Sequence, residues 1–324
     1  MSELLGELPA SKRPDISKPR WPQNTYQGRL QHYWATANPM NLFHSTSEIE
    51  LAQKTVLDYR KGVIDSQMTV DELWRRKNLY DSAYHARTGE KMLLIGRMSA
   101  QCPCNMIITG GLLTSYQHLP GLIFWHWINQ SFNSIVNWTN RSGDNEVSKK
   151  GLLTAYVCAT GGAVTAALGL NAIVKNLHPL IQRFVPFIAI AVANAINIPL
   201  MRNVELRDGI DVSDKEGNKL GSSRVVVRRA ISQVVISRIG IATPHMLITP
   251  AIAHHMMKKQ WYRSSRYANV IMQTVLSGII LTVSTPMCCA LFPQWSCIEV
   301  SKLEKDLQDR IGKKHTLVYY NKGL

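Results

Sequence analysis

The sequence predicts an all-α fold: a multi-span α-helical membrane protein with about five transmembrane helices behind a polar, helical N-terminal region. Acidic residues give the first indication, because Asp and Glu are absent from 91–143, 147–204 and 217–298. Long uncharged runs give the second, at 151–174, 184–201 and 267–298. A helix crosses a bilayer core with roughly 20 mostly apolar residues. The alternative, buried helices of a large soluble protein, would require acids on the exposed helix faces.

Five segments are the predicted spans: 98–117, 151–174, 184–201, 231–256 and 269–292. They define a transmembrane domain over 98–298, between a polar N-terminal region (1–97) and a C-terminal tail (299–324). In the second span, Gly161, Thr165 and Gly169 recur every four residues, which predicts a small face for close contact with another helix.

The two flanking regions have patterns of their own. Five prolines between Pro9 and Pro39 predict that residues 1–44 are extended. Capping boxes at Ser47–Glu50 and Thr69–Glu72 predict helices that run to about Arg60 and Tyr84. In the tail, apolar residues at helical spacing predict a short amphipathic helix outside the bilayer, with one face formed by Val300, Leu303, Leu307 and Ile311.

Charge and cysteine content exclude several classes of function. The net charge is +15, yet the bases stand at span ends and in loops, where they can meet anionic lipid head groups. A nucleic-acid binder would gather them with aromatic residues on one soluble face. The six cysteines show neither a disulfide framework nor zinc spacing, and no nucleotide or nucleophile motif is present. We therefore expect membrane lipid as a partner, and no nucleic acid, cofactor, metal or enzymatic activity.

The segment 124–141 is predicted to be a separate amphipathic helix with a stripe of carboxamides. Asn129, Asn133, Asn137 and Asn140 follow one another at helical spacing, and Gln130 joins them. Each carboxamide both donates and accepts hydrogen bonds, so the stripe suits a zwitterion such as an amino acid. Two alternatives remain: the stripe faces water on an interfacial helix, or it joins helices by hydrogen bonds.

Three further polar residues lie within predicted spans. Asn194 and Asn197 precede Pro199 in the third span, and polar groups in lipid are either functional or bonded to other helices. Arg238 lies in the fourth span, where no acid is available to pair with it. It therefore either reaches the interface or meets a substrate carboxylate. The lack of membrane carboxylates disfavours a proton-coupled symporter and favours facilitated passage or exchange of a neutral solute.

Several strings of residues together resemble the sideroflexin family of the mitochondrial inner membrane. They are Tyr80–His85, Thr88–Met92, Ile95–Ser99, Trp127–Asn133, Asn140–Asp144, Arg183–Phe187, Asn197–Arg202 and Asn321–Leu324. The resemblance implies a five-span protein without a cleaved presequence, imported through internal signals by the mitochondrial import machinery. It implies transport of serine for one-carbon metabolism, with alanine, glycine or cysteine as further substrates.

Two questions stay open at this stage. An inner-membrane scaffold or assembly factor is an alternative function, and a metal-handling (iron) protein is another, although Cys102-Pro103-Cys104 and His254-His255 lack the usual ligand spacing. The resemblance also implies an N-terminus in the matrix and a C-terminus in the intermembrane space. The distribution of Lys and Arg favours the opposite orientation, because the loop 203–229 carries more of them than the opposite loop 257–266.

Overall fold

The computed structural model describes residues 3–85, 88–115, 117–140, 149–174, 182, 184–265, 267–312 and 315–323. The chain divides into two compact units. The first unit contains Met1–Cys104 and Ile135–Arg141, and the second contains Asn105–Ser134 and Ser142–Leu324. The boundary falls inside the first predicted span, so α4 and α5 each contribute to both units.

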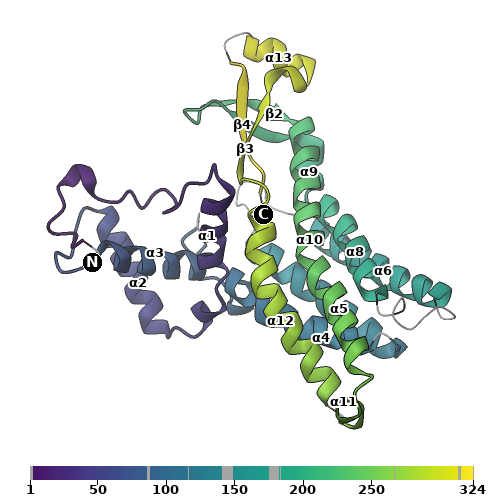
Figure 1. Cartoon of the computed structure of the whole chain (residues 1–324). Coiled ribbons are helices and arrows are strands. Elements are labelled where there is room, and N and C mark those ends of the chain that lie inside the picture. Colours follow the sequence, from purple (N-terminus) through teal and green to yellow (C-terminus); the bar gives the residue numbers. More distant parts are fainter. Residues whose placement is uncertain are drawn as a thin grey trace. The chain divides into compact units, whose positions relative to one another are not determined.

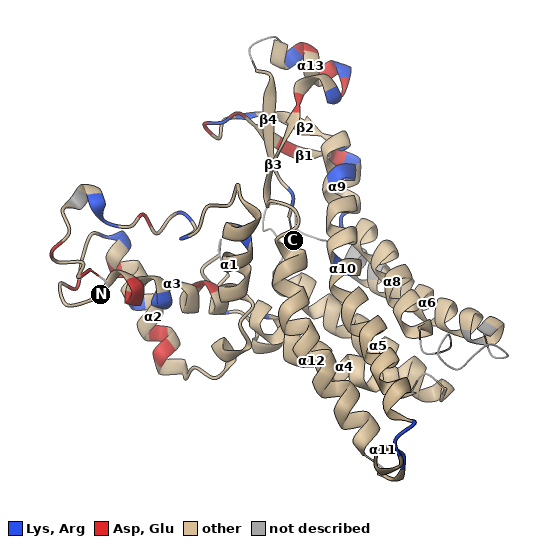
Figure 2. Ribbon diagram, in the orientation of Figure 1, with Lys and Arg blue, Asp and Glu red and all other residues tan. Residues whose placement is uncertain are grey.

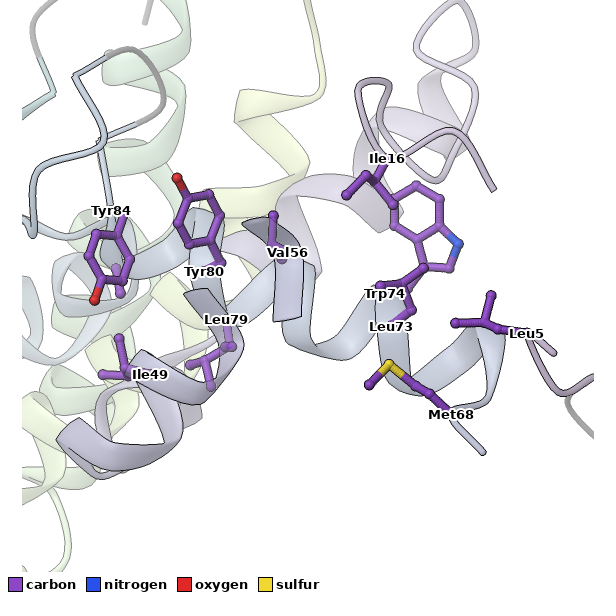
Figure 3. Packing of buried hydrophobic residues seen from close by; sticks show 12 residues of the cluster. Leu5, Ile16, Ile49, Val56, Met68, Leu73, Trp74, Leu79, Tyr80 and Tyr84 are labelled. Atoms are coloured by element: carbon purple, nitrogen blue, oxygen red, sulfur yellow. The ribbon is translucent and has the colours of Figure 1, made fainter. Parts of the chain in front are cut away.

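The first unit is helical and has its own hydrophobic core. Its helices are α1 (Tyr26–Thr36), α2 (Thr46–Arg60) and α3 (Val70–Ala83), with 3-10 turns at Ala10–Lys12, Pro39–Leu42, Leu94–Gly96 and Met98–Ala100. Figure 3 shows apolar side chains of α2 and α3 packed with Leu5 and Ile16 from the N-terminal segment. This core lets residues that flank the prolines fold against the two helices.

Local signals in this unit were predicted with mixed success. Thr69 is confirmed as the N-cap of α3, since its side chain accepts from the Glu72 amide. The α2 capping box is instead Ser45 with Glu48, two residues earlier than predicted. The extended conformation expected for 1–44 is wrong at α1, because Thr25 caps a stretch without proline between Pro22 and Pro39.

The second unit is built on six long helices. They are α4 (Gln101–Ser115), α5 (Leu119–Thr139), α6 (Lys149–Val174), α8 (Val185–Met201), α10 (Arg224–Met256) and α12 (Ala268–Cys289). Two short helices, α9 (Asn203–Asp208) and α11 (Gln260–Ser264), lie between them. Figure 2 shows α4, α5, α8 and α12 without Lys, Arg, Asp or Glu. Within the described residues, α12 is long and apolar enough to cross a membrane, and Tyr156–Leu170 and Val185–Met201 are shorter apolar helices.

The six helices form three antiparallel hairpins. In the α4/α5 hairpin, Gly96 just before α4 lies beside Thr139 and Asn140 at the end of α5, and Gly111 lies beside Trp125. In α10/α12, Thr249 contacts Ser277 and Gly240 contacts Cys288. In α6/α8, Gly162 contacts Ile196. Figure 1 shows α10 and α12 side by side.

Small residues set the closeness of these contacts. On α4, a Cβ added at Gly110 would lie 2.0 Å from the Thr274 hydroxyl, and one at Gly111 would lie 2.0 Å from the Trp125 ring. The two glycines therefore let α4 approach α12 and α5 closely. Pro103 is tolerated because it lies in the first turn, where its missing N–H has no helical acceptor.

The small face predicted on α6 is wrong, because a different face of this helix, rotated about its axis, is the one that packs. No described atom lies within 4 Å of a Cβ added at Gly161 or Gly169. The face that packs is formed by alanines at the same four-residue spacing, namely Ala159, Ala163 and Ala167, which are all buried. Alanine is small enough for close packing and intrinsically favours the helix. The alanine stripe, and not the glycine stripe, therefore forms the packed face.

A four-stranded sheet corrects the all-α expectation. The loop after α9 supplies β1 (Ile210–Ser213) and β2 (Lys219–Ser223), and the tail supplies β3 (Trp295–Glu299) and β4 (Leu317–Asn321). The strand order is β2-β1-β4-β3, and every pair is antiparallel. The predicted apolar face of the tail is present, but its helical part, α13, covers only Lys305–Ile311 after a 3-10 turn at Val300–Lys302. Those apolar residues pack against the sheet.

The tail also caps the longest helix. The Glu304 carboxylate accepts from the Ser223 hydroxyl at 2.7 Å and from the backbone amides of Arg224 and Val225 at 2.7 and 3.0 Å. These amides are the first of α10 and have no acceptor within the helix. Arg202, paired with Glu205, donates to the Lys322 carbonyl at 2.9 Å. The tail is thereby fixed to α9 and to the start of α10.

The glycine contact between α4 and α5 gives a first prediction. Gly111→Ala adds a methyl where the Trp125 ring already lies, so we expect a loss of about 1–3 kcal/mol of stability from overpacking, seen as a lower midpoint of thermal aggregation in detergent. Gly161→Ala is the matched control, because nothing lies within 4 Å of its added Cβ and alanine favours the helix. Equal midpoints for the two variants would contradict the packing.

The cap on α10 gives a second prediction. Glu304→Gln removes a charged acceptor from a helix N-terminus, which weakens a cap by about 0.5–2 kcal/mol. Amide hydrogen exchange in β2 and the first turn of α10 should therefore accelerate by roughly 2- to 30-fold. Asp309→Asn, an exposed position on α13, makes the same change of charge and should leave exchange unchanged.

The cap should also respond to acid. Burial raises the pKa of Glu304, but hydrogen bonds from Ser223 and the helix amides outweigh burial and lower this pKa below its usual 4.5. A lowered pKa means that the stabilisation is complete above about pH 4.5 and is lost as pH falls further. In Glu304→Gln this part of the acid dependence should be absent.

Candidate functional site

The helix α5 carries its polar side chains inward and its apolar ones outward. Asn129 and Gln130 are buried, and so is His126, which is 0% exposed. The opposite face is apolar and exposed, with a shallow groove lined by Leu119, Pro120, Ile123, Phe124 and Trp127. The interpretation of Asn129 and Gln130 as a water-facing stripe is therefore wrong.

Two of these buried side chains have atoms without a partner. Among the residues that the structure describes, the two ring nitrogens of His126 and the amide nitrogen of Asn129 make no hydrogen bond within the protein. A buried polar group that lacks a partner is unfavourable by about 1–3 kcal/mol. Such atoms are available to a polar solute or to water, which would supply the missing bonds.

His126 was missed from the sequence. It precedes Asn129 and Gln130 by three and four residues, so it shares their helical face. The spacing to Asn129 and Gln130 is the signal that places His126 on this face, one turn before the predicted asparagine stripe. Asn133 continues this face and is half-buried.

The far end of the predicted stripe has a different environment. Asn137 and Asn140 belong to the first unit, whereas Asn129 and Asn133 belong to the second. The Asn140 amide donates to the Gly96 carbonyl and to the Val136 carbonyl, each at 2.8 Å. Asn140 thus closes the open end of the α4/α5 hairpin, the helix-joining role that the sequence left open. Asn137 is half-buried.

The hairpin α10/α12 repeats the arrangement of α5. Along its seam the hydroxyls of Thr249 and Ser277 lie 3.3 Å apart, and Ser284 donates to the Ile241 carbonyl. Gln273 is buried and donates to Asn269, while its own carbonyl oxygen has no partner in the described part of the chain. The outer face of α12 is aliphatic, with Val270, Ile271, Val275, Ile279 and Val283 exposed.

The remaining predicted residues lie on α8 and α10. Asn197 is buried, and its carboxamide oxygen has no partner among the described residues, whereas Asn194 is half-buried. Arg238 is half-buried on α10. It lies eight residues, or about 12 Å, beyond Ala230, which still packs in the sheet cluster.

The interior of the second unit therefore holds polar side chains among its apolar ones. Helices α5, α6, α8, α10 and α12 each hold at least one buried side-chain oxygen or nitrogen without a partner in the described structure: His126, Asn129, Thr160, Asn197, Gln233, Ser237 and Gln273. None of these helices contains an Asp or Glu. No group of three His, Cys, Asp or Glu side chains suited to a metal occurs within the described ranges.

Helices with apolar exposed faces and polar groups among their buried residues define a class of protein. A helix face formed by exposed large apolar side chains, as on α5 and α12, indicates contact with lipid, and polar groups that turn away from it indicate an interior with hydrophilic positions. The fold and the site thus describe a helical membrane protein that can accommodate a polar solute.

Comparison with known proteins agrees with this class. The family profile described as Sideroflexins matches residues 15–324. The chain is 51% identical to human Sideroflexin-1 over 324 residues, which is 99% of this chain and 100% of the human protein. It is 49% identical to Sideroflexin-1.1 of Caenorhabditis elegans over 96% of this chain and 97% of that protein, and 49% identical to rat Sideroflexin-3 over 99% and 100%.

The chain belongs to the sideroflexin family. Sideroflexins are membrane proteins of transporter type, and the homologues imply a mitochondrial function of that type. No solved structure matches the chain.

Proposed function

We propose that this protein carries small neutral amino acids, with serine as the principal substrate, across the mitochondrial inner membrane. The observation that supports the proposal most is the buried polar face of α5, where His126 and Asn129 hold donors and acceptors that the described protein does not use. Family membership supports the transporter class, and the resemblance noted from the sequence supports serine and one-carbon metabolism.

The chemistry of the interior matches a zwitterion of no net charge. Carboxamides offer acceptors to the ammonium and donors to the carboxylate of an amino acid, and a neutral imidazole offers one of each. Such groups replace the water lost by the solute without binding it so tightly that release is slow. The absence of membrane carboxylates in these helices removes the usual proton relay, so facilitated passage or exchange is the proposed mode.

Other positions have supporting roles in the proposal. Gln130 and Asn133 extend the solute-binding face of α5, and Asn197, with Asn194 beside it, contributes from α8. Asn137 lies one helical turn beyond Asn133 on α5, and Arg238 on α10 attracts the substrate carboxylate. In this proposal the N-terminus lies in the matrix.

A third prediction tests this site. His126→Leu removes a buried group without a described partner, so abundance and thermal stability should equal or exceed those of the wild type. Serine uptake into proteoliposomes should fall roughly tenfold to a hundredfold, as expected for the loss of one or two hydrogen bonds to the solute. Asn133→Leu should behave in the same way.

Phe124→Leu on the outer face is the matched control and should leave uptake unchanged. Wild-type uptake by His126→Leu at normal abundance would remove this face from the site. A wild-type protein that moves no small neutral amino acid would favour a scaffold or assembly factor. Stoichiometric iron on the purified protein would instead favour metal handling.

A further inference from the structure

We propose that the first unit rests on the membrane surface through an apolar anchor patch, formed by Met40, Phe43, Leu93, Leu94 and Ile95. The anchor patch inserts into the boundary between lipid head groups and acyl chains, on the side of the membrane where α4 begins. The proposal depends on the membrane class of the protein and is independent of the solute that it carries. All residues of the patch belong to the first unit.

The anchor patch is exposed although the first unit has its own hydrophobic core. Met40 is 62% exposed and Phe43 is 80% exposed. Leu93, Leu94 and Ile95 follow one another in the chain and are 53%, 54% and 47% exposed. Exposed apolar residues that are scattered singly are normal on a water-soluble surface, but a consecutive run of three indicates contact with a partner.

Two segments distant in sequence form the patch, and both lie at the start of α4. The run Leu93–Ile95 ends six residues before Gln101, the first residue of α4. The turn Pro39–Leu42 contacts the turn Met98–Ala100, which leads directly into α4. The patch is therefore located where the chain enters the first of the uncharged helices.

An ion pair connects the same two segments beside the patch. Lys91, two residues before Leu93, lies 3.9 Å from Glu50 of α2, and both side chains are exposed. Helix α2 begins three residues after Phe43. The pair thus holds the segment before Leu93 against the helix that follows Phe43, and its charges remain available to water and lipid head groups.

The end of α5 marks the level of the membrane surface at this place. The Asn140 amide donates to the Gly96 carbonyl at 2.8 Å, and the Thr139 side chain lies against Gly96. Trp138, the preceding residue of α5, is 47% exposed, and tryptophan is enriched where a helix leaves the bilayer. Gly96 directly follows Ile95, so Leu93–Ile95 lie at the level of this tryptophan.

These features favour lipid over a soluble partner. Helices α4 and α5 contain no Lys, Arg, Asp or Glu, and the anchor patch continues their apolar surface past the ends of both helices. Apolar and aromatic side chains bind at the head-group boundary in proportion to the apolar area that they bury. The patch itself contains no charged residue, so neutral phosphatidylcholine is sufficient for the contact.

The test is electron paramagnetic resonance on the full-length protein in phosphatidylcholine vesicles. A nitroxide spin label is placed on Phe43→Cys or Leu94→Cys after the six native cysteines are replaced. Two collision rates are measured, with oxygen, which concentrates in lipid, and with a neutral, water-soluble nickel chelate. Phe43 is the decisive position, because it is far from α4 in the sequence.

Val63→Cys is the matched control, since Val63 is apolar, 63% exposed and part of the same unit, but follows the opposite end of α2. The ratio of the oxygen rate to the chelate rate should be severalfold higher at positions 43 and 94 than at position 63.

Two results would overturn the proposal. A ratio at position 43 equal to that at position 63 means that the patch faces water. A label at position 43 that is shielded from both reagents means that protein covers the patch, either the second unit or a second copy of the chain. The collision rates report position and not transport, so failure of serine uptake in proteoliposomes would affect the proposed function alone.

Discussion

The outward faces of α5 and α12 are aliphatic and aromatic, and their inward faces hold His126, Asn129, Gln273 and Ser277. The contact of these outward faces with lipid is the constraint on which the rest of the structure depends. Lipid offers no hydrogen bonds, so every polar group must turn toward the other helices. The interior that results is rich in amides and hydroxyls and contains no carboxylate, which is the property that suits an uncharged polar solute.

Because lipid tails are as apolar as leucine, burial of apolar surface does not hold such helices together. Close approach and interhelical hydrogen bonds take its place. Gly110 and Gly111 allow α4 to contact Thr274 and Trp125, and Thr249 pairs with Ser277 between α10 and α12. Outside these helices, Glu304 of the C-terminal tail caps the first turn of α10. This cap fixes the end of the helix that forms the polar contacts with α12.

Much of this architecture could be predicted from the sequence, since long uncharged runs and the lack of acids depend only on the lipid. The positions of α6, α8, α10 and α12 follow from these runs. Features that depend on partners distant in sequence could not be predicted. Strand β1 pairs with β4 across 106 residues, and neither strand exceeds five residues. Helix α6 has two stripes of small residues, and which of them forms the packed face depends on the contact with α8. His126 lies one turn before the asparagine stripe, and a lone histidine among apolar residues carries little signal in the sequence.

The central claim is that the polar face of α5 is reached by water and solute while its opposite face is not. The most direct measurement is labelling of single cysteines at Asn129 and at Phe124 with a membrane-impermeant thiol reagent, with and without serine, after the native cysteines are replaced. The account predicts that position 129 is labelled and that serine slows its labelling, while position 124 stays unlabelled. Labelling at 124 but not at 129, or labelling at 129 that serine leaves unchanged, would contradict it.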